Sequence, residues 1–291
     1  MDFGRLITAM VTPFHEDGSI DWDTTAKLVD HLIEVQRNDS LVVAGTTGES
    51  PTLSDEEKLE LFRFVVRQAA GRCKVIAGTG SNNTAHTVRL TREAEACGVD
   101  GILLVAPYYN KPSQEGLYRH FKAAAEATSL PVMLYNVEGR TGVNISVETT
   151  LRLAELPNVV ATKDCASLEQ LGLIAKGAPA GFKVYSGEDT ATLPALSVGA
   201  YGIVSVAAHL IGAEMKQMIA DYLNGDAAKA AEWHGKLYPV LKGLFHCPHP
   251  VPNPVAVKYA LSIKGLPVGG VRLPLVAVND QEAEFLRQLL A

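Results

Sequence analysis

The chain has 291 residues, 47% of them hydrophobic and 20% charged, which is ample for a large core and excludes a disordered chain. Its 26 basic and 32 acidic side chains give a formal net charge of −6, so we expect no nucleic acid partner. No run reaches the roughly 18 apolar residues of a membrane span, and the N-terminal segment lacks the pattern of a signal peptide. We therefore expect a cytoplasmic protein with no membrane partner.

Short runs rich in Val, Ile or Leu alternate with longer helical patterns. Such runs are typical of strands that are buried on both faces. We predict strands at Leu6–Val11, Ser40–Ala44, Lys74–Ala77, Gly101–Val105, Pro131–Tyr135, Val159–Lys163, Lys183–Ser186 and Gly202–Val206. We predict helices between them at Asp55–Ala70, Thr84–Cys97, Gln114–Ala127, Val147–Glu155 and Ser167–Lys176. Ser54 and Glu57 form a capping box that begins the first of these helices.

Eight strand–helix repeats predict a parallel sheet, and eight strands close an α/β fold of the (β/α)8 TIM barrel type. The alternative is a doubly wound open sheet, which requires a glycine-rich phosphate turn after its first strand, and Thr12–His15 does not resemble one. We predict a catalytic barrel over residues 1–224 and a small helical region over residues 225–291. The expected helices of that region are Ala227–Leu244, Pro254–Ile263 and Asp280–Leu290.

In such barrels the active site lies at the carboxyl ends of the strands and in the loops that follow. Lys163 ends an apolar strand, and alternation places it on one face with Val159 and Ala161, at the mouth of the core. Burial disfavours the ammonium form of a lysine, which favours a Schiff-base nucleophile; the alternative is a strand-end lysine that points to solvent. Tyr135 ends the preceding strand and either carries protons for imine chemistry or is a buried tyrosine bonded to backbone.

Two loops contain groups that suit carboxylates. Gly45-Thr46-Thr47-Gly48 permits a tight turn whose N–H groups and hydroxyls converge on an anion, or it is a generic polar turn. The chain has neither a Walker pattern nor a GxGxxG pattern there, which argues against a nucleotide. Arg140 follows the fifth strand and can bind a second carboxylate with two hydrogen bonds, although many loop arginines are simply solvated.

The sequence gives little support for a metal ion, and we predict no metal site. The segment His246–His249 holds three potential ligands, but its proline and the lack of distant partners argue against a site. Glu188 and Asp189 are either paired carboxylates or, as we prefer, acids at the N-terminus of a helix. The cysteines form no CxxC pair, which argues against a disulfide framework or a structural zinc ion. They are Cys73, Cys97, Cys165 and Cys247.

Several motifs together resemble the family of pyruvate-dependent class I aldolases that includes N-acetylneuraminate lyase and dihydrodipicolinate synthase. The resemblance spans nearly the whole chain, from Thr8–Phe14 to Arg272–Leu275. The motifs that carry it are Gly45-Thr46-Thr47-Gly48-Glu49-Ser50, Pro107-Tyr108-Tyr109-Asn110-Lys111-Pro112, Leu134-Tyr135-Asn136, Lys163 at the end of the sixth strand, and Pro252-Asn253-Pro254.

The resemblance implies a lyase of lysine and diaminopimelate biosynthesis that condenses pyruvate with L-aspartate 4-semialdehyde to 4-hydroxy-tetrahydrodipicolinate. It implies that Lys163 forms an imine with pyruvate and that no metal or organic cofactor is needed. It also implies a homotetramer built as a dimer of dimers. By the same resemblance, Thr46 and Thr47 bind the carboxylate of pyruvate, and Arg140 binds the carboxylate of the aldehyde. A proton relay runs through Thr47, Tyr135 and a neighbouring subunit's copy of Tyr109. The backbone of Gly187 and Val204 lines the pocket.

The chain departs from the family pattern in two places. Glu138 stands where the family usually has proline, and this acid lies two residues before Arg140. The positions that match the family's allosteric L-lysine site are Ser50, Lys58, Asn82, His86 and Tyr108. Lysine-sensitive members typically carry histidine at the position of Lys58 and glutamate at that of His86, so we predict weak or absent inhibition by lysine.

Two other functions remain open at the level of the sequence. A 2-keto-3-deoxy sugar-acid aldolase uses the same mechanism, but Arg140 and the Tyr108–Tyr109 pair favour the synthase, because sugar-acid enzymes need groups that bind hydroxyls. A non-catalytic keto-acid-binding protein is expected to lose Lys163 or Tyr135, and this chain retains both.

Overall fold

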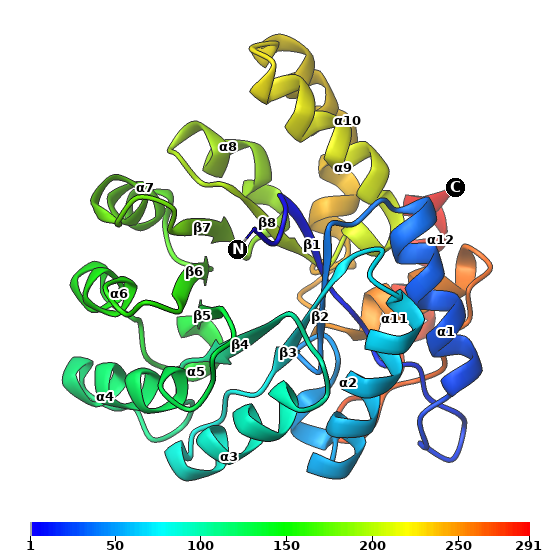
Figure 1. Ribbon diagram of the computed structural model, residues 1–291. Helices are drawn as coiled ribbons and strands as arrows, with labels where there is room; N and C mark the ends of the chain where they lie inside the picture. Colours follow the sequence, from blue (N-terminus) through cyan, green and yellow to red (C-terminus); the bar gives the residue numbers. More distant parts are fainter. Residues whose placement is uncertain (1) are drawn as a thin grey trace.

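Eight parallel strands form a closed barrel with helices around it in the computed structural model, which describes residues 2–291 (Figure 1). Each strand pairs with the next along the chain, and β8 pairs with β1, so the predicted (β/α)8 barrel is confirmed. The strands are β1 Leu6–Ala9, β2 Ser40–Val43, β3 Lys74–Gly78, β4 Gly101–Val105, β5 Val132–Asn136, β6 Val159–Asp164, β7 Lys183–Ser186 and β8 Gly202–Ser205.

The eight predicted helices are present and end within a few residues of the predicted boundaries. The helices are α1 Trp22–Asp30, α2 Asp55–Ala69, α3 Thr84–Glu95, α4 Gln114–Ala125, α5 Glu138–Thr141, α6 Val147–Ala154, α7 Leu168–Gly177, α8 Thr192–Ser197, α9 Ala208–Leu223, α10 Ala227–Gly243, α11 Val255–Ile263 and α12 Asp280–Leu290. Of these, α1, α5, α8 and α9 were not predicted individually. Shorter helical turns lie at His31–Val35, Ser50–Thr52 and Asp189–Ala191. The capping box that begins α2 is present, since Ser54 and Glu57 each bond the other's backbone N–H.

The strands pack on both faces, which is why they are so uniformly apolar. Their inward side chains form one buried cluster that includes Ile7, Val42, Ile76, Leu103, Met133, Tyr135, Ala161, Tyr185 and Val204. Their outward side chains pack against the surrounding helices in a larger cluster. The layer arrangement leaves only the ends of the strands open for polar chemistry.

One strand departs from simple alternation. Val132 of β5 pairs with Val159, but Met133 pairs with Ala161, so Val160 is an extra residue in β6. Val159 packs in the outer cluster, whereas Ala161 packs in the interior one. The prediction that Val159 shares a face with Ala161 and Lys163 is therefore wrong, because a bulge resets the alternation.

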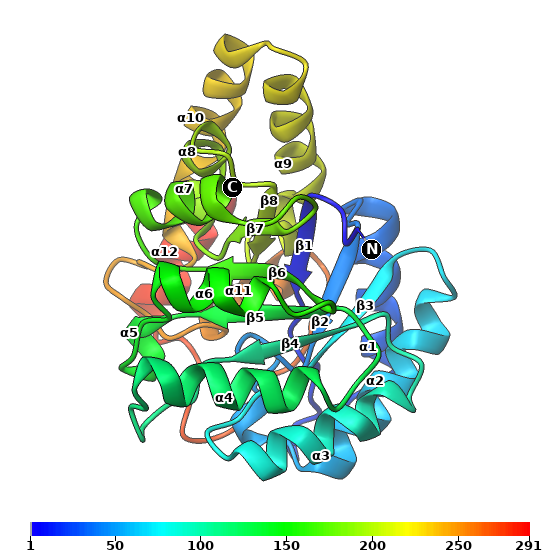
Figure 2. The ribbon, with the colours of Figure 1, turned by 60° about the vertical axis from the view of Figure 1, so that its left-hand side comes forward.

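The helices after β8 continue the outer core. α9 and α10 pack side by side and project from the barrel (Figure 2). Leu237, Leu261 and Leu286, from α10, α11 and α12, belong to the same buried cluster as the outer faces of the strands. The predicted boundary at residue 224 stays a prediction.

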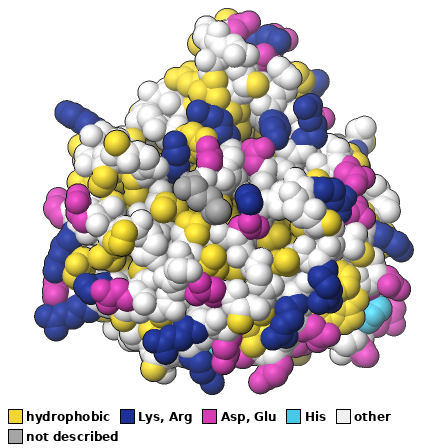
Figure 3. Space-filling view, in the orientation of Figure 1, with side chains coloured by type: hydrophobic (Ala, Val, Ile, Leu, Met, Phe, Trp, Pro, Cys, Tyr) yellow, Lys and Arg dark blue, Asp and Glu magenta, His cyan; other side chains and the backbone are white. Residues whose placement is uncertain are grey.

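The surface mixes charges of both signs. Lysine and arginine side chains alternate with acidic ones over the face in Figure 3, and no large patch of one sign is visible there. Within residues 2–291, no helix combines the length and the apolar composition that crossing a membrane requires.

Candidate active site

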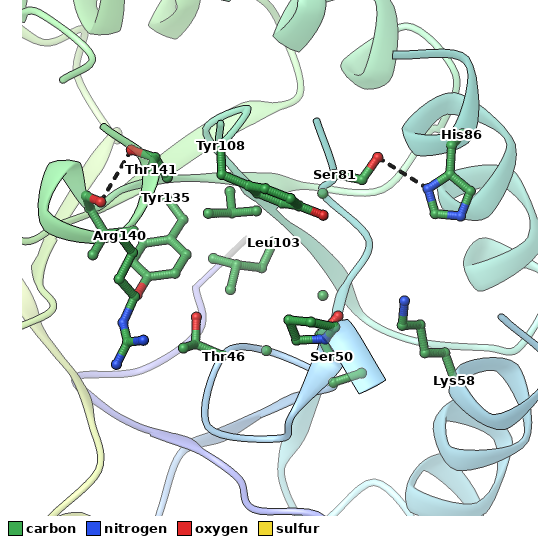
Figure 4. Close-up of a pocket in the computed structure, with 17 residues that line it drawn as sticks. Thr46, Ser50, Lys58, Ser81, His86, Leu103, Tyr108, Tyr135, Arg140 and Thr141 are labelled. Atoms are coloured by element: carbon green, nitrogen blue, oxygen red, sulfur yellow. Dashed lines mark hydrogen bonds between the residues drawn. The ribbon is translucent and has the colours of Figure 1, made fainter. Parts of the chain in front are cut away.

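A cavity of about 360 Å³ opens beside the carboxyl ends of β2 to β5. Its walls come from the turn after β2, the loops after β3 and β4, and the short helix α5 that follows β5. Of the predicted site residues, those that line it are Thr46, Ser50, Lys58, His86, Tyr108, Tyr135 and Arg140. Figure 4 shows Thr46 and Arg140 at one end of this cavity and Lys58 and His86 at the other.

Lys163 and Tyr135 lie directly beside one another across two strands. They are register partners in β5 and β6, and the Lys163 Nζ atom lies 4.1 Å from the centroid of the Tyr135 ring. Both side chains are buried, at 6% and 5% exposed, and Tyr135 forms part of the cavity wall. A primary amine and a phenol are therefore held together, with the phenol in the cavity wall. Lys163, Thr47, Gly187 and Val204 are not among the residues that line this cavity.

Gly187 makes room for the lysine chain. A Cβ atom at this position would lie 2.9 Å from Cε of Lys163 and 2.3 Å from Sγ of Cys165, so only glycine fits here without movement of the neighbours. Its N–H donates to the carbonyl of Asp164, which fixes the loop after β7 against the end of β6. Val204 lies in β8 with its side chain buried in the barrel interior, 1% exposed.

The turn after β2 folds tightly. Ala44 and Glu49 flank it with φ of 53° and 57°, the left-handed region that non-glycine residues seldom adopt. The N–H of Glu49 donates to the carbonyl of Thr46, which closes the turn. Thr46 faces the cavity, whereas Thr47 is buried and its hydroxyl accepts a hydrogen bond from Nδ2 of Asn253 at 2.9 Å.

Arg140 lies on the exposed helix α5, at the same end of the cavity as Thr46 (Figure 4). The neighbouring Thr141 is buried and donates to the carbonyls of Val137 and Val143, which anchors the end of this short helix. Glu138 is exposed, two residues before Arg140. The guanidinium is thus free to meet an anionic group in the cavity.

Tyr108 and Tyr109 point to different places. Tyr108 lines the cavity, whereas Tyr109 is 89% exposed, has a φ of 73° and does not reach the cavity of its own chain. The single chain therefore does not bring Tyr109 together with Thr47 and Tyr135.

The predicted allosteric residues gather only in part. Ser50, Lys58 and His86 line the far end of the cavity, and Asn82 lies outside it. Burial lowers the pKa of Lys58, against the opposing effect of Asp55. The carboxylate of Asp55 is bonded by His86 at 2.8 Å and Arg89 at 2.7 Å, and lies 3.8 Å from the Lys58 amine.

The comparisons with known proteins agree with this geometry. The model of the dihydrodipicolinate synthetase family matches residues 2–291. The chain belongs to this family. A relative from Symbiobacterium thermophilum, named 4-hydroxy-tetrahydrodipicolinate synthase, is 56% identical over 99% of this chain and 97% of its own length.

Solved structures of family members superpose closely. A dihydrodipicolinate synthase from Bacillus anthracis is 52% identical, with a TM-score of 0.96 over 100% of this chain and 98% of that one. A synthase from Cyanidioschyzon merolae, described with lysine bound, is 44% identical, with a TM-score of 0.96 over 99% of this chain and 97% of that one. This chain therefore shares its fold with both solved structures over nearly its whole length.

A buried acid beside the lysine escaped the sequence analysis. Asp164 follows Lys163, is 0% exposed, and accepts hydrogen bonds from Asn136 and from Gln170. Burial raises the pKa of its carboxyl group. Asn136 also accepts from the N–H of Ile145, so this network ties the ends of β5 and β6 to the loop that carries α5. The signal available was an acid directly after the strand-end lysine.

A second buried acid, Asp189, holds the end of β8, in contacts that the sequence analysis did not predict. Asp189 is 2% exposed, and its carboxylate accepts from the N–H groups of Val206 and Ala207 at 3.1 and 2.8 Å. Burial raises its pKa to about 6. Although Asp189 begins a short helical turn, its carboxylate bonds the chain after β8, so its main role is tertiary.

A third overlooked group is Lys258, the one charge in the apolar sequence of α11. It is 2% exposed and forms an ion pair with Glu49 of the turn after β2.

The segment His246–His249, which holds three potential metal ligands, makes a contact within the protein: His249 forms a hydrogen bond with Glu282. Within residues 2–291, no three His, Cys, Asp or Glu side chains come close enough to hold a metal ion.

Proposed function

We propose that this chain is a 4-hydroxy-tetrahydrodipicolinate synthase, which condenses pyruvate with L-aspartate 4-semialdehyde for lysine and diaminopimelate biosynthesis. The observation that carries the proposal is the buried Lys163 amine, 4.1 Å from the ring of Tyr135, which forms part of the cavity wall. A buried amine beside a phenol suits imine formation, because the amine can attack a ketone carbon and the phenol can exchange protons with the reacting atoms.

In the proposed reaction the Lys163 amine attacks the ketone carbon of pyruvate and expels water, which leaves an imine. Loss of a methyl proton gives an enamine, whose carbon then attacks the aldehyde. Attack of the substrate's own amine on the imine carbon closes the ring and releases Lys163. The protonated imine nitrogen is the electron sink for these steps, so the chemistry requires no metal or organic cofactor.

The loops divide the substrate between them. Thr46 and Thr47 bind the pyruvate carboxylate with the N–H groups of their turn, and the backbone of Gly187 and Val204 lines the pocket around the lysine. Arg140, at the same end of the cavity as Thr46, binds the carboxylate of the aldehyde. A guanidinium near a tight turn of N–H donors suits two substrates that each carry a carboxylate.

The proton relay through Thr47, Tyr135 and Tyr109 requires a second subunit. Tyr109 supports this, because it is 89% exposed and lies outside the cavity of its own chain. An aromatic side chain so exposed beside an active site suits an interface. We therefore propose a homotetramer, a dimer of dimers, in which Tyr109 enters a neighbour's site.

A sugar-acid aldolase is the alternative that one observation favours. Glu138 is exposed beside Arg140 and weakens the attraction of this loop for a carboxylate. Initial rates with L-aspartate 4-semialdehyde and with glyceraldehyde as acceptors distinguish the two enzymes. We expect the semialdehyde to be preferred, and a preference for glyceraldehyde would replace the synthase by the aldolase.

The central experiment is reduction with borohydride in the presence of pyruvate, followed by peptide mass spectrometry. We expect a pyruvyl adduct on Lys163 and none in a Lys163→Ala variant. An adduct on another lysine, or no adduct, contradicts the proposed mechanism for every substrate considered above.

A further inference from the structure

The turn that carries Thr46 and Thr47 is held from a distant part of the chain. Glu49 ends this turn in a left-handed conformation, with a φ of 57°, and is 2% exposed. That conformation is unfavourable for a residue with a side chain, so surrounding contacts must maintain it. The Glu49 carboxylate supplies two of them.

The first contact is an ion pair with α11. Nζ of Lys258 donates to Oε1 of Glu49 at 2.7 Å and to the carbonyl of Gly270 at 2.5 Å. The amine also lies 4.2 Å from the centroid of the Phe14 ring. The second contact is the N–H of Arg272, which donates to Oε2 of Glu49 at 2.9 Å. Both carboxylate oxygens of Glu49 therefore accept a hydrogen bond, and both donors lie in the segment after α10.

The same segment reaches the threonine itself. Nδ2 of Asn253 donates to the Thr47 hydroxyl oxygen at 2.9 Å. Because that oxygen accepts a hydrogen bond from Asn253, the Thr47 O–H is left to donate to another group. Thr12, after β1, donates to the carbonyl of Gly48 at 2.7 Å and fixes the other side of the turn.

We propose that Glu49, Lys258 and Asn253 are positioning residues that set the affinity of the enzyme for the carboxylate of pyruvate. This inference rests on the function proposed above, in which the turn binds that carboxylate. The three side chains do not touch the substrate; they fix where the N–H groups and hydroxyls of the turn converge. Hydrogen bonds to an anion weaken steeply when donors shift or tilt, so a relaxed turn binds pyruvate less tightly.

Stability alone explains this arrangement poorly. Two charges with 2% exposure each lose most of their hydration, and an apolar pair of the same volume stabilises a fold as well or better. An ion pair with hydrogen bonds is directional, whereas an apolar contact is not. At the end of the anion-binding turn, a directional contact holds the backbone of the turn in one conformation.

The test uses two variants of the full-length enzyme. Glu49→Gln combined with Lys258→Met removes the pair without leaving a buried unpaired charge, and Asn253→Ala removes only the bond to Thr47. We expect KM for pyruvate to rise about tenfold in the double variant and severalfold in Asn253→Ala, because binding to the carboxylate is weakened throughout the reaction. We expect kcat and KM for the aldehyde to change less than about threefold.

The matched control is Lys216→Met. It removes a lysine from a lysine–aspartate pair, with Asp39 at 2.6 Å, at the opposite end of the barrel. We expect lower stability and an unchanged KM for pyruvate. If either folded site variant keeps the pyruvate KM of the unaltered enzyme, the inference is wrong. Borohydride trapping distinguishes failure of this inference from failure of the proposed function. If the unaltered enzyme forms no adduct at Lys163, the proposed function itself is wrong.

Discussion

The rim of the barrel has two sides that are built differently. On the closed side, residues 11–14, 44–52 and 206–209, buried side chains hold the backbone: His209 accepts from the N–H of Val11, Asp189 binds the N–H of Ala207, and Lys258 binds Glu49. On the open side, residues 106–112 and 137–146, Arg140 and Tyr109 are exposed, and the two loops bond each other through the N–H of Tyr109 and the carbonyl of Thr141.

This difference matches the two proposed substrates. In the proposed reaction, pyruvate contacts the closed side, where the geometry of the donors is fixed before binding. The acceptor aldehyde would meet the open side, where single substitutions change the charge without disturbing a buried network. Lys163 and Tyr135 would serve both substrates. We expect changes at the floor and on the closed side to have large effects, and changes on the open side to have smaller ones.

The largest effect is expected at the floor between the two sides. Lys163→Ala removes the amine that forms the imine, so kcat should fall more than about a thousandfold. A coupled assay with both substrates measures this, and Lys176→Ala, at an exposed position of α7, is the control that should stay fully active. Substantial activity in Lys163→Ala would show that Lys163 does not form the imine, and the two sides could then not be compared as parts of one imine-forming site.

The closed side should be sensitive to acid through His209. Its Nε2 accepts from Val11 and its Nδ1 donates to the carbonyl of Val206, so the ring is neutral, and burial lowers its pKa to about 4. Between pH 6.5 and 4 the unfolded chain takes up a proton here that the folded chain does not. Stability is therefore complete above about pH 6.5 and is lost as pH falls, by about 3 kcal/mol in total.

Denaturant unfolding at pH 7 and pH 4 tests this expectation in the unaltered chain and in His209→Gln. The difference in unfolding free energy between the two pH values should be about 3 kcal/mol smaller in the variant. Burial also lowers the pKa of His120 to about 4, but this group is present in both proteins and cancels. Equal pH dependence in both proteins would mean that His209 does not hold the closed side in its neutral form.

The sequence predicted the barrel, its strand order and the floor of the site, because these depend on local patterns. Apolar runs ending in Tyr135 and Lys163 place both residues at the rim once the strands form a barrel. The closed side was missed, because its contacts join residues far apart: Glu49 and Lys258 are separated by 209 positions. The bulge at Val160 was missed for a related reason, since pairing with β5 and not the local sequence determines it.

A smaller effect is expected on the open side from Arg140→Ala. Loss of a charge-assisted hydrogen bond to the aldehyde's carboxylate should raise KM for L-aspartate 4-semialdehyde about tenfold, while KM for pyruvate stays the same. Glu138→Gln removes the neighbouring acid and should lower the aldehyde KM slightly. Steady-state kinetics with each substrate varied in turn measures both changes. Equal increases in both KM values in Arg140→Ala would contradict the division of substrates between the two sides.

The smallest effect is expected from L-lysine at the far end of the cavity. Among the described residues that line this cavity none is acidic, whereas Lys58, His86 and Arg140 are basic, and Asp55 nearby is already bonded to His86 and Arg89. A cationic ligand is repelled there and finds no free carboxylate for its amine. Initial rates at sub-millimolar L-lysine should therefore be unchanged, and marked inhibition would show that the charges of this cavity do not control the ligand. The double variant Lys58→His/His86→Glu removes a lysine and adds an acid, so it should gain inhibition by L-lysine if charge alone keeps this ligand out.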